Sequence, residues 1–186
     1  MSEKQTKPVI RLDIRGSVAW LTLCRPERHN AMGMAFFKSL REDLQALDQD
    51  PAVRVVVICA EGKNFTVGLD LMEAGGILTS KDVTDRERLK RFILELQSSF
   101  NAIEQCRKPV IAAAHGYCIG GGVDLLSACD IRIASADACF SIRETRIAII
   151  GGIRSWRDCE FAFLHPKKMN GALLELIDYK WRELDE

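Results

Sequence analysis

The chain has 186 residues, 47% of them hydrophobic, which is enough to bury one core without disulfide or metal support. Lysine plus arginine and aspartate plus glutamate both number 26, so no overall field attracts nucleic acid or anionic lipid. No apolar run approaches the roughly 20 residues that span a membrane, and MSEKQTKP lacks the apolar core of a secretion signal.

Seven cysteines occur without a C-x-x-C pair, most of them inside apolar runs. This pattern predicts buried free thiols in a reducing compartment and no metal site. Together with the absence of a signal core, it predicts a cytoplasmic protein. Three consecutive glycines at 120–122 lack the G-x-G-x-x-G frame, so we expect no dinucleotide cofactor.

The N-terminal third of the sequence predicts a hairpin, a helix and a strand. Apolar runs at 9–14 and 18–23, split by Arg15-Gly16-Ser17, are typical of a β-hairpin. Apolar residues at helical spacing predict a helix over 34–47, and RVVVICA at 54–60 predicts a buried strand.

Strands and helices continue to alternate further along the chain. A loop over 61–70 precedes a long amphipathic helix over 84–106. A strand over 109–114, a glycine-led helix, and short strands near 131–134 and 139–142 follow. This alternation predicts an α/β fold with right-handed crossovers. In the tail, the apolar residues between 172 and 177 predict one short amphipathic helix.

The most informative stretch is KPVIAAAHGYCIGGGVDLLSACDIRIASADACFSIRE, at 108–144. A strand that runs into a glycine-led helix gathers unpaired N–H groups and positive dipole, and glycines let a ligand approach that backbone. Asp124 and Glu144 are candidate carboxylates for proton transfer beside a carbonyl. Taken singly, Asp124 also suits a helix start, Glu144 also suits a surface partner of Arg143 or Arg146, and the glycines also suit turns.

This stretch, with RPERHNAM at 25–32 and NFTVGLDL at 64–71, resembles the crotonase family, the enoyl-CoA hydratases and isomerases. The resemblance covers roughly residues 8–150. It implies a crotonase-like spiral of ββα units over 1–150 and a divergent tail over 151–186, without the family's usual C-terminal helices. It also implies an acyl-CoA substrate with no cofactor beyond its coenzyme A. The family's trimeric assembly is expected, although the missing helices would weaken it.

In the family, two backbone amides bind the thioester oxygen, and the resemblance carries that oxyanion hole to Leu69 and Gly121. The resemblance also makes Asp124 and Glu144 the proton-handling pair, with the base and the acid left open. Aspartate at the first position looks more like the Δ3,5-Δ2,4-dienoyl-CoA isomerases than the hydratases. Substrate and CoA contacts are expected from Arg28, Ala31, Phe65, Val67, Asp70 and Gly120.

The family pattern is lost after Ala148. Gly152 stands where dienoyl-CoA isomerases carry a third active-site aspartate, and the following residues have no family match. A shortened variant and a frameshift both account for such a tail. A dienoyl-CoA isomerase of fatty-acid β-oxidation is the favoured hypothesis. A 2-enoyl-CoA hydratase and a non-catalytic acyl-CoA-binding relative are the alternatives.

Overall fold

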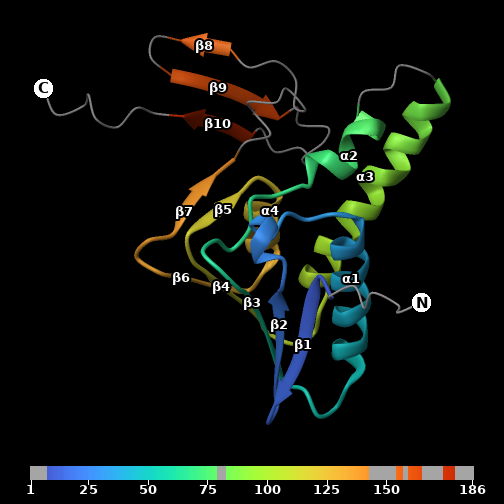
Figure 1. Cartoon of the computed structure of the whole chain (residues 1–186), viewed down its shortest axis with the longest axis vertical. Coiled ribbons are helices and arrows are strands. Elements are labelled where there is room, and N and C mark those ends of the chain that lie inside the picture. Colours follow the sequence, from blue (N-terminus) through green and yellow to red (C-terminus); the bar gives the residue numbers. More distant parts are fainter. Residues whose placement is uncertain (1–7, 79–82, 143–153, 157–158, 165–173, 179–186) are drawn as a thin grey trace, which may run out of the picture. The chain divides into compact units, whose positions relative to one another are not determined.

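The computed structural model describes residues 8–78, 83–142, 154–156, 159–164 and 174–178 (Figure 1). The chain divides into two compact units, Met1–Ser141 and Ile142–Glu186. The first unit contains every predicted site residue except Glu144. Within the described ranges, no helix is long and apolar enough to cross a bilayer.

A five-stranded sheet forms the centre of the first unit, in the order β1-β2-β3-β4-β6. Its strands are β1 (Ile10–Arg15), β2 (Val18–Leu23), β3 (Val55–Ala60), β4 (Val110–Ala114) and β6 (Ile131–Ala134). The predicted hairpin pairs β1 with β2 antiparallel, whereas β2, β3, β4 and β6 run parallel to one another. The apolar runs of β2, β3 and β4 are buried or partly buried, whereas β6 is exposed along its length. The predicted α/β class is therefore confirmed.

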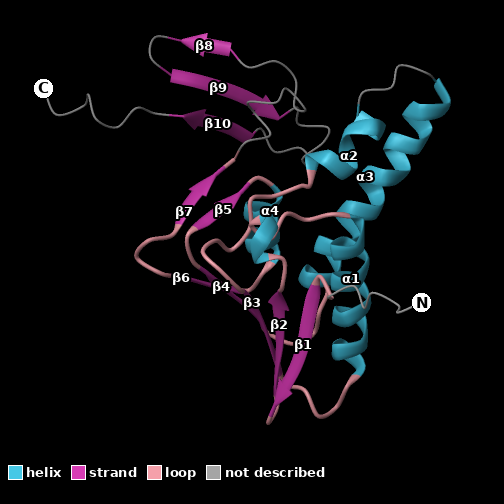
Figure 2. Ribbon diagram, viewed as in Figure 1, coloured by secondary structure: helices cyan, strands magenta, loops and turns pink. Residues whose placement is uncertain are grey.

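Two long helices, α1 (Met34–Gln49) and α3 (Val83–Glu104), pack against each other (Figure 2). Apolar residues at helical spacing give α1 one buried face. Phe37 on this face meets Phe100 of α3 edge to face, with ring centroids 5.7 Å apart. Both helices lie within three residues of the ends that their apolar periodicity predicts.

Shorter elements surround the carboxyl ends of the parallel strands. They are the 3₁₀ turn η1 (Pro26–Arg28), α2 (Leu71–Leu78), β5 (Tyr117–Ile119), α4 (Gly121–Ala128) and β7 (Cys139–Ser141). Strands β5 and β7 pair parallel as a separate ribbon. The sequence predicts α4 and β7 but not α2 or β5. The two glycines in LMEAGGIL are unfavourable in a helix, so the sequence did not predict α2. Strand β5 has only three residues, too few to show an apolar periodicity.

The second unit contains a three-stranded antiparallel sheet in the order β10-β9-β8. Its strands are β8 (Arg154–Trp156), β9 (Cys159–Leu164) and β10 (Leu174–Asp178). The predicted helix over 172–177 is wrong where the structure describes it, because residues 174–178 pair with residues 160–164. Pairing across a sheet has overridden a weak helical pattern in a five-residue segment.

Candidate functional site

Three loops meet at the carboxyl edge of the parallel sheet. Residues 24–33 follow β2, residues 61–70 follow β3, and residues 115–120 follow β4. Because these strands are parallel, the loops leave the sheet at the same edge. Ligands of open α/β sheets bind at this edge. Topology alone thus brings together the three sequence motifs.

The middle loop is hydrogen-bonded to both of its neighbours. Thr66 donates its N–H to the Tyr117 carbonyl at 3.0 Å, and its own carbonyl accepts from the Ile119 N–H at 3.0 Å. On the other side, the Met32 N–H donates to the Gly68 carbonyl at 2.8 Å, and the Asp70 N–H donates to the Met32 carbonyl at 2.9 Å. The loop therefore continues the sheet as a short parallel ladder with alternating partners.

This alternation leaves the Leu69 amide without a partner. Residues 68 and 70 face Met32, so the N–H of Leu69 is directed to the opposite side, where residues 115–121 run. That neighbouring segment leaves the ladder to begin α4 at Gly121, whose own N–H is one of the orphan donors of a helix start. Among the described residues, neither amide has a hydrogen-bond partner.

The two amides are close because Gly68 packs directly against the start of α4. Gly68 has a φ of +85°, and a Cβ added to it would lie 2.6 Å from the Ile119 carbonyl oxygen and 3.4 Å from the Gly121 nitrogen. A Cβ on Gly121 would in turn lie 2.8 Å from Cε of Met32. Only glycine permits this approach of backbone to backbone at position 68.

Two unpaired N–H groups beside the positive end of a helix form an anion-binding arrangement. Such preorganised donors stabilise an oxygen that gains negative charge during a reaction. The geometry therefore supplies what an oxyanion hole needs. It brings together Leu69 and Gly121, which are separated by 51 intervening residues in the sequence.

Buried polar side chains hold the three loops in place. The Thr66 hydroxyl donates to the Asn30 carbonyl at 2.6 Å and accepts from the Gly68 N–H at 3.1 Å. The Asn30 amide nitrogen donates to the Glu61 and Asn64 carbonyls. Sequence reasoning missed these residues. The signal was present, since threonine and asparagine inside otherwise apolar loops must find internal partners when buried.

The two histidines of the motifs lie in this scaffold. Nδ1 of His29 is 3.0 Å from the Asn64 amide nitrogen, and Nε2 of His115 is 2.8 Å from the Gly62 carbonyl oxygen. Both rings thus satisfy neighbouring loop atoms, as a structural role requires. The described residues hold no cluster of three His, Cys, Asp or Glu side chains suited to a metal ion.

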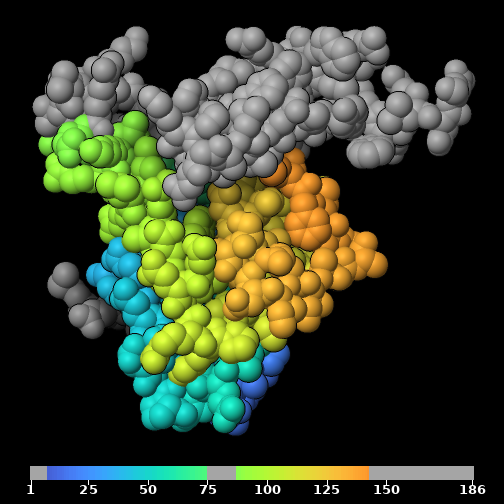
Figure 3. Space-filling model, turned by 180° about the vertical axis from the view of Figure 1, so that it is seen from behind, coloured from blue at the N-terminus to red at the C-terminus, as the bar shows by residue number. Residues whose placement is uncertain are grey.

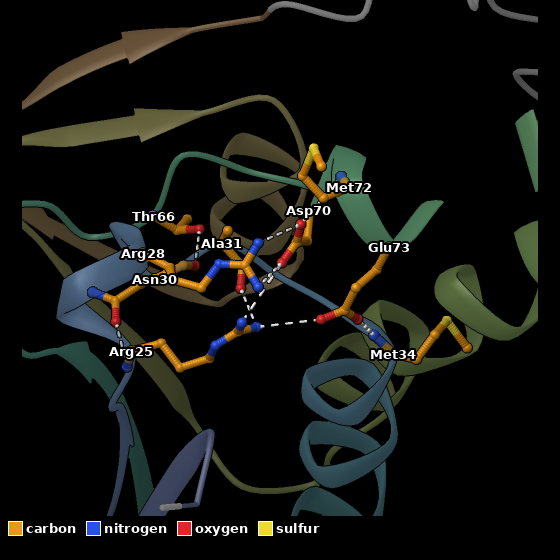
Figure 4. Close-up of polar contacts among 9 residues, drawn as sticks. All are labelled: Arg25, Arg28, Asn30, Ala31, Met34, Thr66, Asp70, Met72 and Glu73. Atoms are coloured by element: carbon orange, nitrogen blue, oxygen red, sulfur yellow. Dashed lines mark hydrogen bonds and ion pairs between the residues drawn. The ribbon is translucent and has the colours of Figure 1, made fainter. Parts of the chain in front are cut away.

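Several residues predicted to contact substrate are engaged internally. Asp70 is only 3% exposed, and its carboxylate pairs with the guanidinium groups of Arg25 and Arg28 (Figure 4). Phe65 is fully buried, and its N–H donates to the His115 carbonyl at 2.9 Å, so the structure does not place it to meet a ligand. Ala31 is partly exposed in the loop after β2.

The remaining predicted contacts lie at the edge of the amide pair. Val67 is half-buried and donates its N–H to the His29 carbonyl at 3.2 Å. Gly120 is buried at the N-cap of α4, and its N–H donates to the Ser141 carbonyl at 2.9 Å. The backbone N–H groups of both residues are therefore engaged within the protein.

The two candidate carboxylates differ in how far they are defined. Asp124 lies exposed in the first turn of α4, three residues after the Gly121 amide. Glu144 lies outside the described residues, as does Gly152. The structure therefore brings one carboxylate to the helix that carries the Gly121 amide.

An apolar cavity of about 350 Å³ lies beside α4, β4, β6 and β7. Figure 3 shows the face that carries this part of the chain, in yellow and orange beside α3 in lime. The lining residues are Ala114, Val123, Leu126, Ser127, Arg132, Ile133, Ala134 and Phe140. None of them is a predicted site residue, although Val123 is the neighbour of Asp124 in the sequence.

Comparison with known proteins gives consistent matches. The sequence pattern of the enoyl-CoA hydratase/isomerase family matches residues 13–157. Over 158 residues the chain is 46% identical to the peroxisomal Δ3,5-Δ2,4-dienoyl-CoA isomerase of Arabidopsis thaliana, covering 82% of this chain and 57% of the relative. Over 140 residues it is 44% identical to the mitochondrial Δ3,5-Δ2,4-dienoyl-CoA isomerase of Mus musculus, covering 73% and 43%.

A solved structure agrees with the sequence relatives. The crystal structure of an enoyl-CoA hydratase/carnithine racemase from Magnetospirillum magneticum matches with a TM-score of 0.71 and 29% identity, covering 79% of this chain and 54% of that one. The chain spans about half the length of the curated relatives it matches.

These matches confirm the resemblance seen in the motifs and correct one prediction. The expected cytoplasmic location is contradicted, because the two relatives described above are a peroxisomal and a mitochondrial enzyme. The free thiols and the plain N-terminus were weak evidence for a compartment, since reducing conditions are not unique to the cytoplasm. By its sequence pattern, its relatives and its fold, the chain belongs to the enoyl-CoA hydratase/isomerase family.

Proposed function

We propose that the chain isomerises a 3,5-dienoyl-CoA to a 2,4-dienoyl-CoA, with the Leu69 and Gly121 amides holding the thioester oxygen. The observation that carries this proposal is the close approach of two unpaired amides at the start of α4. The dienoyl-CoA isomerases at 46% and 44% identity support the choice of reaction. Asp124 on the same helix supports proton transfer nearby.

The proposed chemistry shifts one hydrogen from the α-carbon to the far end of the conjugated system by two proton transfers, and no other atom of the substrate changes place. A carboxylate takes the proton from the α-carbon, and the electron pair of that C–H bond spreads through the conjugated system onto the thioester oxygen. Each preorganised amide stabilises this charge by about 3–4 kcal/mol. The charge then returns along the chain, and a carboxylic acid protonates the far end of the conjugated system.

Asp124 and Glu144 are the proposed proton-handling pair, in either order. The substrate brings coenzyme A as part of its own structure, and we propose no further cofactor. Action in fatty-acid β-oxidation is part of the proposal, and the names of the relatives support a peroxisome or mitochondrion as its location. A homo-oligomeric assembly is also proposed, and light scattering of the purified protein tests it.

A second candidate reaction is the hydration of a 2-enoyl-CoA. The enoyl-CoA hydratase/carnithine racemase from Magnetospirillum magneticum, with a TM-score of 0.71, favours it. Hydration would use the same oxyanion hole and two carboxylates, with water as the added reactant. The products separate the two reactions, since isomerisation creates a conjugated dienoyl thioester and hydration destroys the enoyl chromophore.

An ultraviolet assay of the purified chain tests both reactions. With a 3,5-dienoyl-CoA, we expect growth of the conjugated 2,4-dienoyl absorbance, lost in Glu144→Gln and in Asp124→Asn. Glu104→Gln, which neutralises an exposed carboxylate in the last turn of α3, is the matched control and should keep full activity.

Two results would contradict the isomerase proposal, and a third would contradict its catalytic residues. Loss of enoyl absorbance from a 2-enoyl-CoA, without turnover of the dienoyl thioester, would establish the hydratase instead. Binding of the thioester by folded protein without turnover of either substrate would identify a non-catalytic relative. Full activity in both carboxylate variants would refute the assignment of the proton-handling pair.

A further inference from the structure

A cluster of charged side chains follows the Leu69 amide directly. One oxygen of the Asp70 carboxylate, Oδ2, lies 3.2 Å from Nη1 of Arg28 and 3.6 Å from Nη2 of Arg25. The other, Oδ1, accepts from Nη2 of Arg28 at 3.3 Å and from the Met72 backbone N–H at 3.2 Å (Figure 4). Asp70 therefore caps the first turn of α2 and pairs with two arginines of the loop after β2.

Stability alone does not explain this cluster. Taking a carboxylate out of water is unfavourable unless ion pairs and hydrogen bonds replace the water. Asp70 is 3% exposed, and its Oδ2 atom receives no well-aligned hydrogen bond from the described residues although both guanidinium groups lie within ion-pair distance. An apolar contact would serve stability as well or better at such a buried position. The ion pairs also restrict the position of the backbone beside Asp70.

The cluster fixes the peptide groups on both sides of the unpaired amide. Backbone hydrogen bonds join Gly68 and Asp70 to Met32, and the ion pairs join the Asp70 side chain to the same loop. Leu69 lies between these attachment points. A rotation that turned its N–H away from Gly121 would break either the backbone bonds or the ion pairs.

Glu73 adds a second attachment one turn further along α2. Its Oε2 accepts from the Met34 N–H at 3.1 Å, at the start of α1, where Gly33 offers no capping side chain. Its Oε1 lies 3.8 Å from Nη1 of Arg25. Arg25 also donates to the Ala31 carbonyl at 3.3 Å, so this single guanidinium connects the loop after β2 to both carboxylates.

We propose that Asp70 and Arg25 are positioning residues that hold the Leu69 amide in line with the Gly121 amide. This inference rests on the proposed oxyanion hole. Arg25 is the inner partner, with 17% of its side chain exposed, and Arg28 is the outer one, with 42% exposed. Asp70 therefore acts through the backbone of Leu69 and does not touch substrate.

The test combines kinetics with amide hydrogen exchange. Asp70→Asn keeps the size of the side chain and removes its charge. A misplacement of about 1 Å at a catalytic group lowers kcat by up to about 100-fold. We therefore expect kcat of Asp70→Asn to fall by about 10- to 100-fold, with KM changed less than about threefold because the substrate's other contacts remain. Exchange of the backbone amides at positions 32 and 70 should accelerate in the same variant.

Two further variants complete the design. Arg25→Lys keeps the positive charge but loses the planar fork that reaches both carboxylates, so it should show the same effects more weakly even if Asp70→Asn does not fold. Asp48→Asn removes the carboxylate of another Asp–Arg pair, with Arg107 at the end of α1. It should leave kcat and the exchange at residue 32 unchanged.

The outcomes separate this proposal from the proposed function. Unchanged exchange at residues 32 and 70 would overturn the positioning role, whatever the activity. Accelerated exchange with full kcat would also overturn it. Uniform acceleration across the whole chain would show a general loss of stability instead. If exchange at residues 32 and 70 accelerates in Asp70→Asn but the wild-type protein turns over no enoyl thioester, the positioning role of Asp70 is supported and the proposed enzymatic function is refuted.

Discussion

Gly68 offers the most direct test of how the two amides are brought together. Replacing it with alanine introduces two separable penalties. The first is conformational, since Gly68 has a φ of +85°, where a Cβ meets its own backbone. The second is a clash, because the new Cβ would lie 2.6 Å from the Ile119 carbonyl oxygen, an atom of a hydrogen-bonded segment that cannot easily move.

The magnitude of each penalty follows from a matched control in the same chain. Gly16, in the turn between β1 and β2, has a φ of +60° but no atom within 4 Å of an added Cβ. Gly16→Ala should therefore lower the free energy of unfolding by only the conformational penalty, about 1–2 kcal/mol. Gly68→Ala adds overpacking of about 1–3 kcal/mol, so its total loss should be about 2–5 kcal/mol.

Urea unfolding, followed by circular dichroism and tryptophan fluorescence, measures both variants against the wild type. The slope of the transition must stay constant for the comparison to hold. We expect the Gly68→Ala midpoint to lie well below that of Gly16→Ala. In the enzyme assay, Gly68→Ala should lose about 100-fold or more in kcat, because its Cβ separates the two amides. Equal midpoints for the two variants would refute the close approach of Gly68 to α4.

Three further predictions concern the scaffold around the site. Burial raises the pKa of the Cys118 thiol to about 12, so iodoacetamide at about pH 8 should modify the exposed Cys139 and leave Cys118 intact until the protein unfolds. The backbone N–H of Arg107 holds the pKa of Asp48 below its ordinary 3.8. Stability from this group is complete above about pH 4 and lost as the pH falls through the lowered value, so Asp48→Asn should flatten the acid side of the stability profile. Thr66→Val should lower the free energy of unfolding by about 1–3 kcal/mol, because it leaves two buried backbone groups without their hydroxyl partner.

Each of these predictions has a control and a contradicting result. Mass spectrometry after digestion assigns the alkylated cysteines, and rapid labelling of Cys118 in folded protein would contradict its burial. A stability profile of Asp48→Asn that parallels the wild type below about pH 4 would remove the assigned role of Arg107. Thr66→Ser keeps the hydroxyl and serves as the control for Thr66→Val. Because Thr66→Ser also deletes a buried methyl group, the deciding comparison is with the wild type, and equal stability of Thr66→Val and the wild type would show that the hydroxyl bonds contribute nothing.

The sequence predicted the elements whose apolar periodicity is long and regular. The helices α1 and α3, the first hairpin and the strands β3 and β4 all follow from spacing. The glycine-led start of α4 was recognised from residues 120–122. In contrast, β10 was mistaken for a helix, because five residues cannot distinguish period 2 from period 3.6 when the partner strand is unknown.

The site was predictable in its parts but not in its connections. That Leu69 and Gly121 belong together came from family resemblance, because their approach depends on the register of a parallel ladder between distant segments. The partners of Asp70 were missed for the same reason. Its pairing with Arg25 spans 44 intervening residues and follows only from the order of the strands. Spacing along one chain carries no information on such contacts.

The short ladder over residues 65–70 has one further consequence. Its backbone hydrogen bonds alternate between two neighbouring segments, but the Leu69 N–H finds no carbonyl acceptor. The neighbouring segment begins α4 at the point where that carbonyl would lie. In the proposed function, a thioester oxygen bound between Leu69 and Gly121 would take the position of that absent carbonyl, and the substrate would complete the ladder. Recognition of the reacting group then belongs to the main chain. The Leu69 side chain packs against the hydrophobic core and leaves binding of that oxygen to the backbone.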